Sequence, residues 1–135
     1  MELVKSKIYQ KDDIQVVNSS KGVYDTFIKD LFSLMSIPEG YIKILAALID
    51  IKDKNNNIVV NKYIKQNIAD KIGLDNKSNI NYINNAISCF YKNGLLTNIS
   101  RGVYKIDDMI LIHSNSIKLD IKYSQQGKEI KAKGE

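Results

Sequence analysis

The stretch NKYIKQNIADKIGLDNKSNINYINNAISCFYKNGLLTNISRGVYKI, residues Asn61 to Ile106, decides the fold of this 135-residue chain. Its first part carries isoleucines one helical turn apart, at Ile64, Ile68 and Ile72. That spacing predicts one apolar stripe of an amphipathic helix. Asn61 is a favourable N-cap for this helix, and Gly73 tolerates the positive φ that ends one.

A second, longer helix is expected to begin between Asn76 and Ser78 and to end at Lys92, with Gly94 past its end. Apolar residues at three- and four-residue steps predict its core face, which holds Ile80, Ile83, Ala86, Ile87 and Phe90. The opposite face is polar and has no carboxylate; it holds Ser78, Asn81, Tyr82, Asn85, Ser88 and Lys92.

Two short β-rich runs follow, Leu95–Ile99 and Val103–Ile106, joined by Ser100-Arg101-Gly102. A tight turn containing Gly between such runs predicts a β-hairpin. Arg101, the one arginine of the chain, is then at the hairpin tip. Its planar guanidinium suits a narrow groove lined with acceptors and phosphates better than a lysine does.

Positive charge is concentrated in this stretch. Residues 61–106 contain seven basic and two acidic side chains, a net charge of +5 that equals the net charge of the whole chain. The remaining residues are therefore balanced. An excess of positive charge confined to two helices and a hairpin is what contact with nucleic-acid phosphates requires.

The preceding segment predicts two helices and a strand. Tyr24–Met35 has helical periodicity, and Ser36-Ile37-Pro38-Glu39 is a helix-start signal in which Ser36 is the cap. The next helix, Gly40–Asp50, is expected to bury Ile42, Leu45, Ala46 and Ile49. Ile58–Val60 reads as a short strand that pairs with the hairpin. This order predicts an α+β winged helix-turn-helix with four main helices, a β-hairpin wing and extra terminal strands.

The ends of the chain are expected to add strands to a single domain, residues 1–124, with its core at 24–106 and terminal strands at 5–17 and 109–123. Alternation over Ile117–Tyr123 predicts a half-buried strand. Its partner is left open between an N-terminal hairpin, Lys5–Gln10 with Ile14–Val17, and the same strand of a second subunit. Residues 125–135 are expected to be a disordered tail.

The motifs IADKIG, INNAIS, NGLL and RGVYKI resemble the RepL-type plasmid replication proteins and their phage-borne relatives. The likeness spans Tyr24 to Ile106 and is strongest from Ile68 onward. It implies origin binding that initiates plasmid or phage replication, or transcriptional regulation. The segment LDNKSNINY is about one helical turn longer than the family's link, and DDMILIHSN lacks its Pro and Trp.

The expected partner is double-stranded DNA. Major-groove contacts are assigned to the polar helix face, where an asparagine amide can pair with adenine, and minor-groove contact to the hairpin tip. The alternative is a solvated face in an Asn-rich protein. The predicted DNA-binding residues are Lys62, Lys65, Lys77, Ser78, Asn81, Tyr82, Asn85, Ser88 and Arg101. Three tyrosines are interpreted as packing residues instead: Tyr63, Tyr91 and Tyr104.

No enzyme is predicted. One histidine, one cysteine and the absence of a phosphate-binding G-x-x-x-x-G-K-[ST] loop argue against metal, zinc and ATP chemistry, so no cofactor is expected. We expect a cytoplasmic protein without a membrane partner. A homodimer and contacts with replication or transcription machinery are left open. Two alternative functions are a transcriptional regulator and a protein-interaction module that docks through the strand Ile117–Tyr123.

Overall fold

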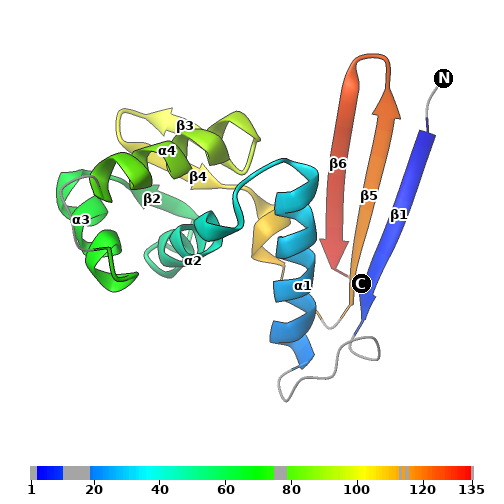
Figure 1. The fold of residues 1–135 in the computed structure, drawn as a ribbon, viewed down its shortest axis with the longest axis horizontal. Helices are drawn as coiled ribbons and strands as arrows, with labels where there is room; N and C mark the ends of the chain where they lie inside the picture. The colour runs from blue at the N-terminus through cyan, green and yellow to red at the C-terminus, as the bar shows by residue number, and fades with distance from the viewer. Residues whose placement is uncertain (1–2, 11–18, 75–78, 113, 115, 135) are drawn as a thin grey trace. The chain divides into compact units, whose positions relative to one another are not determined.

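The computed structural model describes residues 3–10, 19–74, 79–112, 114 and 116–134. These residues form four α-helices and two three-stranded antiparallel sheets, which confirms the α+β class (Figure 1). The chain divides into two compact units. We call Met1–Leu31 with Ile112–Glu135 the terminal unit, and Phe32–Leu111 the helix-rich unit. The terminal strands, which the sequence placed within one domain, thus belong to a unit of their own.

The terminal unit contains β1 (Leu3–Gln10), most of α1 (Ser19–Leu34), β5 (Ser116–Ser124) and β6 (Gly127–Gly134). The sheet order is β1-β5-β6, so β5 is the central strand. One face of the sheet buries apolar side chains together with those of α1. This core holds Tyr9, Ile117, Leu119 and Ile121 from the sheet, and Val23, Phe27, Ile28 and Leu31 from the helix.

The alternation predicted for β5 is confirmed, and its partner within the chain is β1. The prediction of a disordered tail is wrong, because residues 127–134 form β6 and pair with β5. Only Ile130 and Ala132 supply apolar side chains at the inward positions of this lysine-rich strand, so its period of two is faint.

The predicted docking edge on β5 is also wrong, since β1 and β6 occupy both of its edges. The predicted strand Ile14–Val17 lies outside the described residues.

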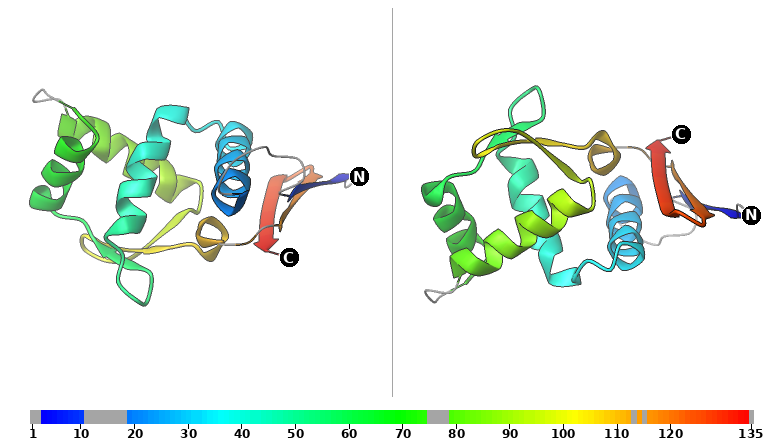
Figure 2. Two further views of the ribbon diagram at one scale, coloured as in Figure 1. Left: turned by 90° about the horizontal axis from the view of Figure 1, so that it is seen from below. Right: turned by 90° about the horizontal axis from the view of Figure 1, so that it is seen from above.

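The helix-rich unit runs in the order η2 (Glu39–Tyr41), α2 (Ile42–Asp50), β2 (Asn57–Val59), α3 (Lys62–Lys71), α4 (Asn79–Lys92), β3 (Leu96–Ser100), β4 (Val103–Ile106) and η3 (Asp108–Leu111). Its sheet has the order β2-β4-β3. The predicted strand before α3 therefore does pair with the hairpin. Figure 2 shows α3 beside α4 in both views. All of these elements except η2 contribute buried side chains to one core, which includes Ile44, Leu48, Ile58, Ile68, Ile83, Phe90, Leu96 and Ile106.

The junction between α1 and α2 differs from the prediction. Ser36 has a φ of 57°, and the Ile37 N–H donates to the Phe32 carbonyl at 2.8 Å, so Ser36 ends α1 and does not cap α2. The buried residues of α2 are Ile44, Leu45, Ala47 and Leu48. The predicted stripe is correct only at Leu45, because nearly every residue of this helix is apolar and periodicity cannot choose a face.

An ion pair joins β1 to α1 in the terminal unit. The Lys7 Nζ and the Tyr9 hydroxyl each lie 2.6 Å from Asp30 Oδ2. Burial alone would raise the pKa of Asp30, but the hydrogen bonds from Lys7 and Tyr9 together lower it below its usual value. Burial, followed by the contact with Asp30, raises the pKa of Tyr9. Ionised Asp30 thus stabilises the fold.

We predict that Asp30→Asn lowers the free energy of unfolding at neutral pH by about 1 kcal/mol. A carboxyl group whose pKa is lowered by folding contributes stability above its unfolded pKa, and loses it as the pH falls through its folded pKa. From about pH 4 downward the wild type should therefore lose more stability than the variant. Urea unfolding across pH measures this, with Asp25→Asn on the exposed side of α1 as control. Parallel pH curves for Asp30→Asn and wild type would contradict it.

Candidate nucleic-acid interface

Hydrogen bonds and backbone dihedral angles at its two ends determine where α3 begins and ends. The Asn61 side chain accepts a hydrogen bond from the Ile64 N–H at 2.8 Å, as expected of its N-cap. Gly73 has a φ of 82°, and the Leu74 N–H donates to the Ala69 carbonyl at 2.9 Å, so the predicted stop is also confirmed. The start of α3 carries an exposed Lys62 and, one turn later, a half-buried Lys65.

The two faces of α4 divide as its periodicity predicted. Its buried side chains include Ile83, Ala86, Ile87 and Phe90. Its exposed polar side chains include Asn81, Asn85, Ser88 and Lys92. Gly94, with a φ of 78°, lies just past the end of the helix. The predicted residues Lys77 and Ser78 lie outside the described residues.

Tyr82 occupies a different flank of α4. Its ring packs edge-on against Tyr41 with 5.2 Å between ring centroids, and its hydroxyl lies close to Gly40, where an added Cβ would be 2.8 Å away. The side chain remains 37% exposed. Tyr82 therefore connects α4 to the segment that precedes α2, while Asn81 and Asn85 are exposed.

The hairpin tip is tied to the start of α3. The Val60 N–H, immediately before the N-cap Asn61, donates to the Gly102 carbonyl at 2.7 Å. Gly102 has a φ of 74°, and an added Cβ would lie 3.2 Å from the Val60 carbonyl oxygen. Arg101 is exposed at this tip, and within the described part of the chain it makes no ion pair.

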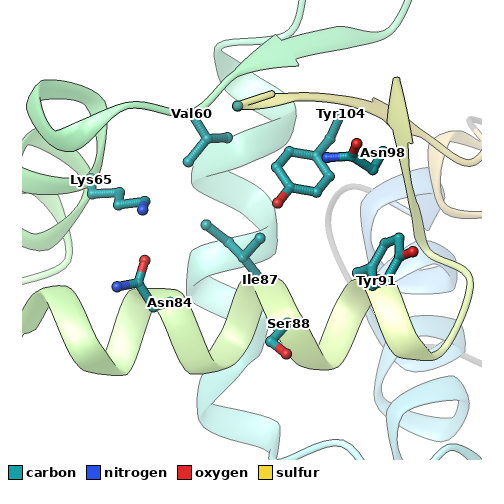
Figure 3. Close-up of a pocket in the computed structure, with 9 residues that line it drawn as sticks. Val60, Lys65, Asn84, Ile87, Ser88, Tyr91, Asn98 and Tyr104 are labelled. Carbon is teal, nitrogen blue, oxygen red and sulfur yellow. The ribbon is translucent and has the colours of Figure 1, made fainter. Parts of the chain in front are cut away.

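A groove of about 540 Å³ lies between α4, the first half of α3 and the hairpin. We call it the hairpin groove; it is lined by Val60, Lys65, Asn84, Ile87, Ser88, Tyr91, Asn98, Gly102 and Tyr104. Figure 3 shows Lys65 and Asn84 pointing toward each other from α3 and α4, and the Tyr104 ring pointing toward Ile87. Side chains from three elements thus meet along one side of α4.

The chemistry of the hairpin groove favours an anionic, hydrogen-bonding ligand. Its lining offers amides, hydroxyls and one ammonium group, and none of the described residues that line it has a carboxylate. Such groups donate to phosphate oxygens and to the edges of bases. The groove is therefore lined by side chains suited to binding.

Few acidic groups neutralise the charge around this groove. Lys71 forms an exposed ion pair with Asp50 at 3.1 Å, and Asp70 accepts a hydrogen bond from Gln66. Five other cationic side chains have no acidic partner among the described residues: Lys62, Lys65, Lys92, Arg101 and Lys105. The positive excess read from the sequence is thus carried by side chains available to an external anion.

Four groove residues with polar side chains were not among the predicted site residues: Asn84, Tyr91, Asn98 and Tyr104. Asn84, Ser88 and Tyr91 share one stripe of α4, but the sequence does not reveal on which side of the helix the hairpin lies. The packing role predicted for two tyrosines is wrong, because Tyr63 is 72% and Tyr91 is 53% exposed. Tyr104 is half-buried.

Comparisons with known proteins add no relative. No family model, curated protein or solved structure matches the chain. Within the described residues, no three His, Cys, Asp or Glu side chains are grouped as metal ligands would be. None of the helices in that part of the chain is long and apolar enough to cross a membrane. The family resemblance therefore depends on the sequence motifs alone.

We predict that Gly102→Ala destabilises the protein by more than the ~1–2 kcal/mol typical of a left-handed L-residue, because its Cβ also crowds the Val60 carbonyl. Gly73→Ala is the matched control. Gly73 has a similar φ of 82°, but its added Cβ would meet nothing within 4 Å. Thermal and urea unfolding compare the two variants. Equal losses of stability would show that the contact between the tip and Val60 imposes no constraint.

Proposed function

We propose that the helix-rich unit is a winged helix-turn-helix that binds double-stranded DNA in a sequence-specific way. The observation that carries this proposal is the set of cations on α3, α4 and the hairpin that have no acidic partner within the described part of the chain. The described lining of the groove beside them has no carboxylate. A surface of this kind attracts a polyanion and has the hydrogen-bonding groups to read it.

The order of elements supports the winged-helix assignment. Helix α2 is followed by β2, α3, α4 and the hairpin, and the sheet order β2-β4-β3 places the first strand against the second strand of the hairpin. In this assignment α3 and α4 are the helix-turn-helix, α4 is the recognition helix, and the hairpin is the wing.

Each polar element then has a role on DNA. Asn81 and Asn85 lie one turn apart on the exposed face of α4, where their amides read adenine in the major groove. Lys62 and Lys65 contact backbone phosphates from α3. Arg101 enters the adjacent minor groove. Tyr82 is a positioning residue in this scheme, because its ring packs against Tyr41.

The biological output that we propose is initiation of plasmid or phage replication at an origin, as the resemblance to RepL-type proteins implies. No catalytic group is needed for this role, since an initiator of this kind binds its site and recruits other factors. The same contacts would serve a transcriptional regulator. The position of the bound site, at an origin or at a promoter, separates the two outputs.

We predict that duplex fragments tiled across the surrounding replicon include one that binds tightly in fluorescence anisotropy, with a steep dependence on salt. Lys65→Ala should reduce the slope of log K against log salt by about 0.9, the value of one lost phosphate contact. Arg101→Ala should also reduce the slope, because it removes a cation from the minor groove. The control is Lys54→Ala, in the turn at the opposite end of the sheet from Arg101. Weak binding to every fragment, unchanged by these variants, would contradict DNA binding.

Sequence preference tests the recognition helix separately. Asn81→Ala and Asn85→Ala should each reduce discrimination against a mutated base pair by about 1–3 kcal/mol while leaving non-specific binding intact. Asn55→Ala, an exposed asparagine in the turn before β2, is the control. Competition assays with single-base variants of the bound fragment measure this effect. If both α4 variants kept the wild-type preference, α4 would not be the reading element.

A further inference from the structure

The outward face of the β1-β5-β6 sheet carries an ordered pattern of charges. Residues directly opposite each other on β5 and β6 have side chains on the same face of the sheet. On this face Lys122 is opposite Glu129, and Asp120 is opposite Lys131. In the third pair, Lys118 is opposite Lys133, so two like charges face each other across the strands.

The surroundings of the third pair do not neutralise it. On the other side of Lys118, β1 places Ile8, which is 44% exposed. The nearer carboxylate, Asp120, accepts a hydrogen bond from the Ser6 hydroxyl at 2.5 Å. Among the residues that the structure describes, neither Lys118 nor Lys133 has an ion-pair partner.

Two lysines directly opposite each other destabilise a sheet, because their Cβ atoms are only about 5 Å apart. The two neighbouring rows avoid this penalty by alternating sign. An anion held between the two ammonium groups would remove it, and a phosphate matches their charge. The row of Lys118 and Lys133 is thus a place where binding a ligand would relieve a repulsion that the free protein carries.

We propose that Lys118 and Lys133 form a second phosphate-binding site, whose ligand is the phosphate backbone of nucleic acid. The choice of ligand rests on the proposed DNA binding. The pair lies on the outward face of the sheet, as suits a continuous backbone. In the next two rows each lysine is opposite a carboxylate, Asp120 or Glu129, so those rows carry no net positive charge to attract phosphate. A strand of nucleic acid is therefore confined to the row of Lys118, Lys133 and Ile8.

Two double variants of the full-length chain test this site. Lys118→Gln/Lys133→Gln should lower duplex affinity and reduce the salt slope by about 2, since about 0.9 is lost per phosphate contact. Lys122→Gln/Lys131→Gln removes the same charge from the same face, but from lysines that have a carboxylate opposite, and should leave the slope at its wild-type value. Equal losses in both variants would mean that only overall charge matters, and would overturn the site.

A single substitution separates binding from stability. Lys133→Glu places a carboxylate opposite Lys118, so it should raise the Tm while weakening DNA binding at least tenfold at low salt. A raised Tm with unchanged DNA affinity would overturn the proposal and leave the pair a surface feature. An unchanged Tm would show that the two lysines do not repel each other, which also overturns it.

Inorganic phosphate distinguishes the ligand and separates this proposal from the proposed function. At constant ionic strength, phosphate should raise the Tm of the wild type and not that of Lys133→Glu. If phosphate has this effect while Lys118→Gln/Lys133→Gln binds DNA normally, the ligand is free phosphate and the nucleic-acid assignment fails. If Arg101→Ala and Lys65→Ala weaken DNA binding but the Lys118/Lys133 variants do not, the proposed function stands and this inference falls.

Discussion

The hydrogen bond from the Val60 N–H to the Gly102 carbonyl is the constraint on which the candidate interface depends. It joins the hairpin tip to the residue before the N-cap of α3, and the register of β2 with β4 continues the same connection. Without this connection to β2 and Val60, the hairpin would be a two-stranded ribbon, which is only marginally stable alone. With it, the tip, the start of α3 and one side of α4 enclose a single groove.

Local signals in the sequence predicted most of this unit because each reports a backbone requirement. Asn61 caps α3, while Gly73, Gly94 and Gly102 occupy positive φ at the ends of helices and at the tip. Such requirements are satisfied within a few residues, so tertiary structure need not be known. The same reasoning failed at Ser36, because a serine between two helices can adopt positive φ and end the first, as it does here, or adopt an extended conformation and cap the second.

The other failed predictions have a different cause: the sequence does not show which elements lie next to each other. The uniformly apolar α2 does not specify its buried face, and the lysine-rich β6 resembles a disordered tail until β5 provides its partner. The groove residues Asn84, Asn98 and Tyr104 could not be grouped from sequence, since the side of α4 that the hairpin covers follows from the pairing of β2 with β4. Tyr82 is a further example, because the sequence does not show that its ring packs against Tyr41.

The short, tied hairpin also limits how this surface could engage DNA. Its tip consists of Arg101 and Gly102, and Gly102 is already bonded to Val60, so the backbone at Arg101 has little freedom left to lose on binding. A pre-ordered contact costs less conformational entropy than one made by a mobile loop. The corresponding disadvantage is reach, because a tied tip cannot extend to meet the minor groove. In a DNA complex, the sequence-dependent shape of the duplex would therefore decide whether Arg101 and α4 can engage together.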